Sequence, residues 1–194
     1  MIPNTITQVH SLPPNVTYHA HRLPAMRVEN WLILGTGPTA AEDWDRVTTF
    51  PLDFLMRSEL VLVNRAQLPG GLSAGRAHHH VTYHGEHYQL APSQLIRNCP
   101  RRHSNVAMPW TTDCWLVPDE FHVGGSAFLA AYIAGQLGIK RAVLIGCPLS
   151  AGSAYAPLLQ QLLDAPKHVW RYYRSIVSSM SGATRDLFGA PSTI

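Results

Sequence analysis

The densest group of side chains able to do chemistry is a run of histidines, His78, His79, His80, His84 and His87, with Glu86 among them. Imidazole and carboxylate groups bind zinc, and a neutral imidazole also accepts a proton from a hydroxyl group near neutral pH. Neighbouring side chains of a strand point to opposite faces, so His79 and His80 cannot share one ion. A turn at Gly85 would bring His80, His84 and His87 together. A polar loop is the commoner explanation, so we predict no metal site and take His84 as the candidate general base.

A glycine turn is the second candidate for chemistry. The apolar run Trp31-Leu32-Ile33-Leu34 leads into Gly35-Thr36-Gly37-Pro38-Thr39. The first N–H groups of a helix lack intrahelical partners, and its dipole favours an anion there. We therefore expect this turn to hold a phosphate on unpaired N–H groups. It lacks the third glycine of a dinucleotide fingerprint and the lysine of a P-loop, so glycine used only for turn geometry is the competing interpretation.

Arginines supply possible phosphate ligands. Arg65 follows an apolar run, and Arg97 stands near Arg101 and Arg102. A guanidinium group binds phosphate through two parallel hydrogen bonds and can stabilise the charge that grows on a leaving group. Ligands of open α/β sheets bind at the carboxyl ends of strands, where Arg65 is expected. A solvated basic loop is the alternative for Arg97 and its neighbours.

Two units of strand, turn and helix are expected to position these groups. The first comprises a strand at 31–35, a helix at 39–50 and a strand at 59–64. In the second, Gly124, Gly125 and the capping residue Ser126 precede a helix at 127–138 and a strand at 141–146. Apolar strands separated by helices indicate a parallel sheet covered on both faces. The predicted fold class is therefore α/β, a Rossmann-like open, mostly parallel sheet with helices on both faces.

The remaining elements are predicted from weaker patterns. Strands are expected at 79–83, 105–108, 114–117 and 175–179, and helices at 92–98, 157–163, 168–173 and near 181–189. Four prolines within residues 1–28 indicate an extended arm rather than a packed element. Residues 29–194 are predicted to form a single Rossmann-like domain.

Composition limits the protein class. The 194 residues are 46% hydrophobic and carry a formal charge of +3, with no long Lys/Arg run, so nucleic acid is an open but not an indicated partner. Three cysteines without a C-x-x-C pair predict free thiols in a reducing compartment. No apolar stretch is long enough for a bilayer, and the first residues lack a leader pattern. We predict a cytoplasmic protein without a membrane partner.

These motifs together resemble a known family. They are Gly35-Thr36-Gly37-Pro38-Thr39, Val63-Asn64-Arg65, a Gly-Ser helix leading to Val143-Leu144-Ile145-Gly146, and Ser179-Met180-Ser181-Gly182 before Phe188-Gly189. In this order, over roughly residues 30 to 190, they resemble the hydroxymethylpterin pyrophosphokinase-like family. That family is similar in fold to bacterial sialyltransferases that use cytidine-monophosphate sugars, and small phage and prophage proteins of unassigned role look similar.

The resemblance implies a nucleotide site. Nucleotide phosphate or ribose would lie against the first glycine turn, near Asn64, with Gly125 and Ser126 at a second helix N-terminus facing the same cleft. Apart from the resemblance, Ser181 and Gly182, with Arg185, either close the cleft or simply cap a helix. Relatives carry an acid soon after the glycine of the later strand, whereas this chain has Gly146-Cys147-Pro148. If that acid holds a metal or activates an acceptor, another residue performs the task here or the task is absent.

The leading functional hypothesis is a glycosyltransferase-like transferase. It would move a group from a nucleotide or nucleotide sugar to an acceptor hydroxyl without any required cofactor. The first alternative is an ATP-dependent pyrophosphokinase of a small heterocyclic alcohol, which needs Mg²⁺ and therefore nearby carboxylates. The acids of the middle region, Glu86, Asp113, Asp119 and Glu120, lack such spacing, which favours metal-independent transfer. The second alternative is a non-catalytic nucleotide-binding or phage accessory protein. The acceptor and the oligomeric state do not follow from the sequence.

Overall fold

The computed structural model describes residues 17–19, 28–67, 77–84, 99–150 and 152–192. Its strands form one sheet in the order β1-β6-β5-β4-β3-β2-β7-β8, and every neighbouring pair is parallel. The strands are β1 (Thr17–His19), β2 (Asn30–Leu34), β3 (Ser58–Val63), β4 (Ala77–Val81), β5 (Arg101–Ser104), β6 (Asp113–Trp115), β7 (Arg141–Ile145) and β8 (Val177–Ser179). The protein therefore has the predicted Rossmann-like α/β architecture.

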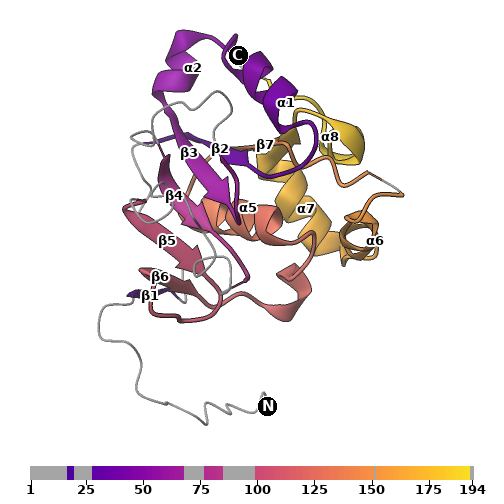
Figure 1. Cartoon of the computed structure of the whole chain (residues 1–194). Coiled ribbons are helices and arrows are strands. Elements are labelled where there is room, and N and C mark those ends of the chain that lie inside the picture. Colours follow the sequence, from indigo (N-terminus) through magenta and orange to yellow (C-terminus); the bar gives the residue numbers. More distant parts are fainter. Residues whose placement is uncertain (1–16, 20–27, 68–76, 85–98, 151, 193–194) are drawn as a thin grey trace.

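Helices cover both faces of this sheet (Figure 1). They are α1 (Ala40–Val47), α2 (Leu52–Met56), the 3₁₀ turn η3 (Asp119–Phe121), α5 (Ser126–Gln136), α6 (Ala156–Leu163), α7 (Lys167–Ile176) and α8 (Gly182–Phe188). One apolar core joins α5 and α7 to one face, and a second joins α1 and α2 to the other. Since side chains alternate along a strand, the continuous apolar run of β2 supplies both cores and is buried throughout.

The order of the strands reverses beside β2. From β2 the chain steps through β3, β4, β5 and β6 toward one edge, and then α5 returns it to β7 on the opposite side of β2. The chain leaves β2 for α1 on one face of the sheet and leaves β7 for α6 and α7 on the other face, so the segments that follow these two neighbouring strands diverge. Ligands of open α/β sheets bind at such a switch point. The topology therefore predicts a ligand site at the carboxyl ends of β2 and β7.

Helix α5 is the central packing element. Its residues from Ser126 to Ala134 are all buried, because the helix lies between the sheet and α7 (Figure 1). Gly138 follows it with a φ of 81°, a left-handed conformation that glycine adopts without strain and that ends helices. The predicted start is wrong by one residue, since the cap position belongs to Gly125, with a φ of 74°. The Ser126 hydroxyl does not cap the helix and instead accepts a hydrogen bond from the Tyr83 N–H at 3.1 Å.

Several weaker predictions need correction. The strand expected at 105–108 lies earlier, as β5, because Arg101 forms an ion pair with Asp113 of β6 and this pairing lets a polar segment join the sheet. The prediction of an unpacked arm is wrong at Thr17–His19, because these residues form β1 and pair with β6. Helix α2 and turn η3 had no predicted counterpart. The helix expected at 92–98 lies outside the described residues.

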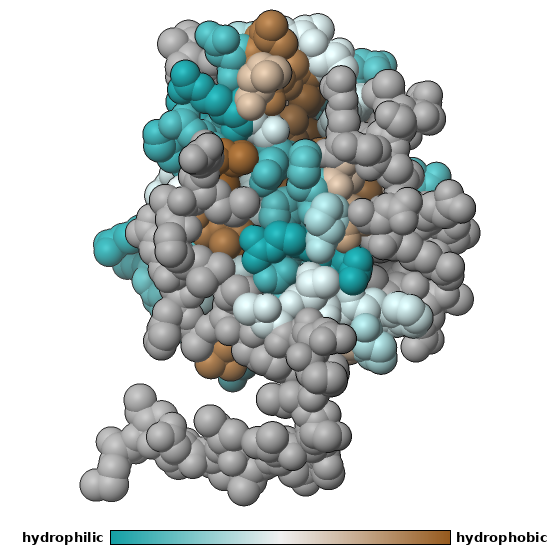
Figure 2. Space-filling model, turned by 90° about the vertical axis from the view of Figure 1, so that its left-hand side faces the viewer, coloured by the Kyte–Doolittle hydropathy of each residue, from teal (hydrophilic) through white to brown (hydrophobic). Residues whose placement is uncertain are grey.

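The surface carries an apolar area on α2. Leu52 and Met56 are 71% and 76% exposed, and Figure 2 shows apolar surface at the top of the molecule, where Figure 1 places this helix.

None of the helices in the described ranges has the length and apolarity needed to cross a bilayer.

Candidate functional site

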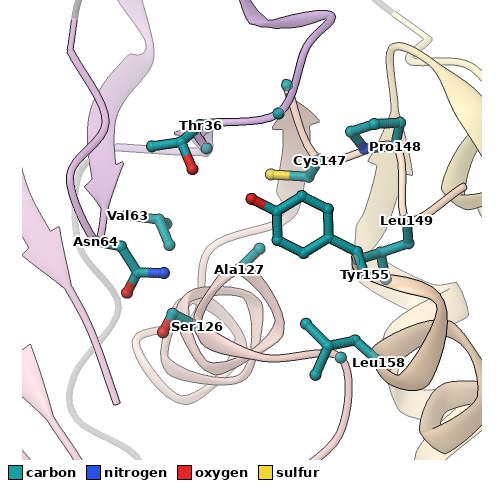
Figure 3. A pocket seen from close by; sticks show the side chains of 14 residues that line it. Thr36, Val63, Asn64, Ser126, Ala127, Cys147, Pro148, Leu149, Tyr155 and Leu158 are labelled. Carbon is teal, nitrogen blue, oxygen red and sulfur yellow. The ribbon is translucent and has the colours of Figure 1, made fainter. Parts of the chain in front are cut away.

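An open pocket lies at the switch point (Figure 3). Its free space for water-sized molecules is about 80 Å³, and its empty space is about 460 Å³ when the open mouth is included. We call it the switch-point pocket; its lining is Gly35, Thr36, Gly37, Val63, Asn64, Gly124, Ser126, Ala127, Gly146, Cys147, Pro148, Leu149, Tyr155 and Leu158. These residues come from the bends after β2 and β7, the end of β3, the start of α5 and the region of α6. The predicted glycine turn at 35–39 and the predicted helix start at Gly124–Ser126 therefore border one cavity.

The bends after β2 and β7 are hydrogen-bonded directly to each other. The Gly35 N–H donates to the Ile145 carbonyl and the Gly37 N–H to the Gly146 carbonyl, each at 2.8 Å. The expectation that the Gly35 and Gly37 N–H groups are unpaired is therefore wrong, and these two groups are not available to a phosphate. They are used instead to fasten the β2 bend to the β7 bend.

Close approach explains why glycine occupies these positions. A Cβ atom on Gly35 would lie 2.5 Å from Cys147 Sγ, and one on Gly37 would lie 2.5 Å from the Gly146 carbonyl oxygen. Gly146 has a φ of 62°, and a Cβ there would lie 2.6 Å from Ala40 Cβ. Any larger residue would force the bends apart, so the competing interpretation, glycine for geometry, is the correct one here.

Asp43 supplies the negative charge at the start of α1. Its carboxylate is 1% exposed, and Oδ2 accepts hydrogen bonds from the Gly146 N–H at 3.0 Å, Ser181 Oγ at 2.6 Å and Thr39 Oγ1 at 3.0 Å. The helix dipole favours a negative group in this first turn. The chain thus places its own anion where a phosphate was expected, and joins the start of α1, the β7 bend and the residue before α8.

Asn64 is held so that its amide faces the pocket. It has a φ of 54°, and its N–H donates to the Val81 carbonyl at 3.1 Å. His80 Nε2 donates to the Asn64 carbonyl at 2.6 Å, and Thr82 Oγ1 donates to Asn64 Oδ1 at 2.7 Å. The side-chain nitrogen points into the cavity, away from these contacts (Figure 3). Strand β4 therefore positions the end of β3 at the site.

The N-terminus of α5 forms the adjoining wall. The N–H groups of Phe128 and Leu129 donate to the Gly125 carbonyl. Those of Ser126 and Ala127, in the first turn, have no hydrogen-bond partner within the described residues. With the partial positive charge of the helix end, they favour an electron-rich ligand atom.

The opposite wall is largely apolar. Leu149 and Leu158 line it together with Tyr155, whose ring lies across the cavity in the view of Figure 3. Burial raises the pKa of the Cys147 thiol to about 12, so the group stays protonated and donates to the Ile145 carbonyl at 3.4 Å. Because the thiolate is the reactive form of cysteine, a thiol held in this way is a poor nucleophile.

The histidines separate into different environments. His78 is exposed, His79 is buried on the α5 face beside Trp31, and His80 contacts Asn64. His79 and His80 thus point to opposite faces, as predicted. His84 is exposed just beyond β4 and does not line the switch-point pocket, and His87 lies outside the described residues. Within the described ranges, no three His, Cys, Asp or Glu side chains form a metal-binding group.

Three buried side chains and one partly buried carboxylate form what we call the imidazole chain, made of Trp115, His103, His79 and Glu59. Trp115 Nε1 donates to His103 Nδ1 at 3.0 Å, His103 Nε2 lies 2.8 Å from His79 Nδ1, and His79 Nε2 lies 2.9 Å from Glu59 Oε2. Because an indole only donates, His103 Nδ1 must accept, and each imidazole then donates through Nε2 toward the carboxylate. His103 has no Nδ1 proton for Asp113, 3.8 Å away.

Other predicted residues lie outside the pocket lining. Thr39 and Ser181 meet at Asp43, their hydroxyl oxygens 2.8 Å apart, while Pro38 is exposed beside the first bend. Gly125 precedes α5, and Gly182 packs closely against Pro148. Arg65 is exposed after β3, and Arg97 lies outside the described residues.

Sequence reasoning missed several residues at the site. No sequence motif contains Thr82, Tyr155 or Leu158, because each residue reaches the site only through tertiary packing. Asp43 had one available signal, because an acid in the first turn of a helix is often bonded to backbone N–H groups. Gly124 was named only as part of the turn before α5.

The described lining contains no Lys, Arg, Asp or Glu. Its polar groups are the side-chain amide of Asn64, the hydroxyl groups of Thr36, Ser126 and Tyr155, and backbone N–H groups. Such a site can hold a ligand by hydrogen bonds and apolar contact, and any charge on the ligand would be met by the end of α5.

Comparisons of the chain with models of known protein families, with curated proteins and with solved structures found no match. The resemblance to the hydroxymethylpterin pyrophosphokinase-like family therefore stays a prediction.

Proposed function

We propose that the protein binds a nucleotide or nucleotide sugar in the switch-point pocket and transfers a group from it to an acceptor hydroxyl. One observation carries the proposal: the amide of Asn64 and the N-terminus of α5 face one cavity at the point where the strand order reverses. Open α/β sheets bind nucleotides at this position.

Each wall of the pocket suits a different part of a nucleotide. Phosphate or sugar oxygens would accept hydrogen bonds from Asn64 and the start of α5, while a base or sugar ring would lie against Leu158 and Tyr155. For a sugar donor, the bond between the anomeric carbon and the phosphate oxygen breaks with its electron pair leaving on the nucleotide. The acceptor oxygen bonds to that carbon and gives its proton to a base. Since the described lining has no carboxylate to hold Mg²⁺, metal-independent transfer is favoured over ATP-dependent pyrophosphoryl transfer.

Calorimetric titration of the full chain tests the proposal. The panel comprises nucleoside monophosphates and diphosphates, cytidine-monophosphate and uridine-diphosphate sugars, and ATP with and without Mg²⁺. We expect binding of a nucleotide or nucleotide sugar without metal. Binding only of Mg²⁺-ATP would replace the transferase with a pyrophosphokinase, and no binding of any panel member would overturn the proposal.

A blocking variant ties binding to this cavity. Thr36 is exposed at the mouth of the pocket, so Thr36→Trp fills the opening without entering the core. We expect at least tenfold weaker binding, about 1.4 kcal/mol. Thr48→Trp, also exposed but outside the lining, is the matched control and should bind like the unmodified protein. Equal binding by both variants would place the ligand elsewhere.

His84 remains the candidate base. It lies at the same carboxyl edge of the sheet but outside the lining, so it would act on an acceptor at the mouth of the pocket. With a nucleotide sugar that binds, His84→Ala should slow transfer about a hundredfold or more. A reduction below about tenfold would remove His84 from this role.

A further inference from the structure

Thr82 controls which way the Asn64 amide faces. Its side chain is fully buried at the end of β4 and does not line the pocket. The hydroxyl oxygen accepts the His84 N–H at 2.9 Å, and its single proton goes to Asn64 Oδ1 at 2.7 Å. The His84 carbonyl, at 3.4 Å, is too distant to compete. Asn64 Oδ1 is thereby occupied, and only the amide nitrogen is presented to the cavity (Figure 3).

The neighbouring polar groups are also hydrogen-bond donors. Ser126 Oγ already accepts the Tyr83 N–H, so its own proton is available for donation. The N–H groups of Ser126 and Ala127 add two donors at the start of α5. We call Asn64 Nδ2, Ser126 Oγ–H and these two N–H groups the donor wall. Each of these four groups can donate a hydrogen bond, and the described lining of the pocket contains no carboxylate beside them.

We infer that Thr82 is a positioning residue that makes this wall donor-only, so that the site selects a ligand group able only to accept hydrogen bonds. The inference rests on the proposed function and specifies its ligand. Two groups of a nucleotide fit this chemistry, a phosphate and the keto oxygen of a base. An exocyclic amino group does not fit, because it would set donors against donors and leave both without partners.

Isosteric variants test the polarity. Asn64→Asp keeps the acceptor for Thr82 and replaces the donor in the pocket by an acceptor, and we expect at least tenfold weaker binding. Thr82→Val removes the hydroxyl that orients the amide and should weaken binding about fivefold or more, while Thr82→Ser should restore it. Asn105→Asp adds the same charge after β5, outside the lining, and should leave binding unchanged. Melting temperatures check that each variant is folded.

The titrants are UMP, CMP, GMP and AMP with their nucleosides. If a phosphate meets the donor wall, Asn64→Asp weakens all four monophosphates alike and leaves the nucleosides unaffected. If the keto oxygen at C4 of uracil or C6 of guanine does, the unmodified protein prefers UMP and GMP, and Asn64→Asp abolishes that preference for nucleosides as well. Either result supports the inference.

Binding by Asn64→Asp or Thr82→Val within twofold of the unmodified protein would overturn the inference while leaving the proposed function standing. Failure of the unmodified protein to bind any of these nucleotides or the wider panel would instead overturn the proposed function.

Discussion

Asp43 is the residue on which the geometry of the two bends depends most. Replacing it by Ala leaves the Gly146 N–H and the hydroxyl groups of Thr39 and Ser181 without their shared acceptor. We expect Asp43→Ala to lower the free energy of unfolding by about 3 kcal/mol, measured by urea denaturation. Asp45→Ala, at an exposed position of the same helix, should change it by less than about 0.5 kcal/mol. Similar losses in the two variants would show that the bends do not depend on this carboxylate.

Glu59, at the end of the imidazole chain, gives the fold a defined pH dependence. Burial alone would raise its pKa, but the hydrogen bond from His79 and the nearby imidazoles lower it below the usual value. A lowered folded-state pKa adds stability above the unfolded-state value, about 4.3, and this stability is lost as pH falls through the folded-state pKa. The difference in unfolding free energy between the unmodified protein and Glu59→Gln should therefore stay constant from pH 7 to about 5 and shrink below pH 4. A difference that does not change between pH 6 and pH 3 would contradict this.

Residue types alone could not distinguish two uses of the glycine turn. A turn that exposes N–H groups to a phosphate and one that lets two strand ends approach closely both need residues without side chains. The choice depends on Cys147 Sγ and the Gly146 carbonyl, which lie more than 100 positions away from the turn. The sequence therefore predicted that the turn after β2 and the start of α5 border one cavity, but not that the Gly35 and Gly37 N–H groups are already bonded.

Elements with strong patterns were predicted closely. The apolar strands β2, β3 and β7 and helix α5 lie within a few residues of their expected bounds, because burial on both faces leaves an unbroken apolar run. Strand β5 was displaced and β1 was not predicted, since their place in the sheet comes from Arg101, Asp113 and the pairing of β1 with β6. Such cross-strand contacts leave no periodic signal in either segment.

The packing of α5 against α7 gives an element-scale prediction. Helix propensity alone favours Ala over Gly by about 1 kcal/mol. A Cβ on Gly135 would, however, collide with the Tyr172 hydroxyl, which donates to the Tyr132 carbonyl at 2.7 Å, and would lie 2.7 Å from Tyr172 Cζ. We expect Gly135→Ala to destabilise the protein by about 1 kcal/mol in urea denaturation. The same change made in a Tyr172→Leu background should be neutral or stabilising; an equal loss in both backgrounds would show that Tyr172 is not the obstacle.

The cysteines report on the opening of the whole molecule. Cys99, Cys114 and Cys147 are free and buried, and burial raises the pKa of each, to about 11 for Cys99 and about 12 for Cys147. The thiolate is the reactive form, so at pH 8 these groups should react with an aromatic disulfide reagent at least ~100-fold more slowly than free cysteine. All three should react after unfolding in urea. Rapid reaction of any thiol in the absence of urea would reveal an opening near it.

The imidazole chain connects four neighbouring strands of the sheet through side chains. Its members come from β6, β5, β4 and β3, and its direction is imposed at one end by an indole that only donates and at the other by a carboxylate that only accepts. Reversing the direction of any link would require proton rearrangement in both rings. With both imidazoles neutral, the chain therefore has one arrangement of its ring protons, and it joins Trp115, near one edge of the sheet, to Glu59 beside the central strand β2.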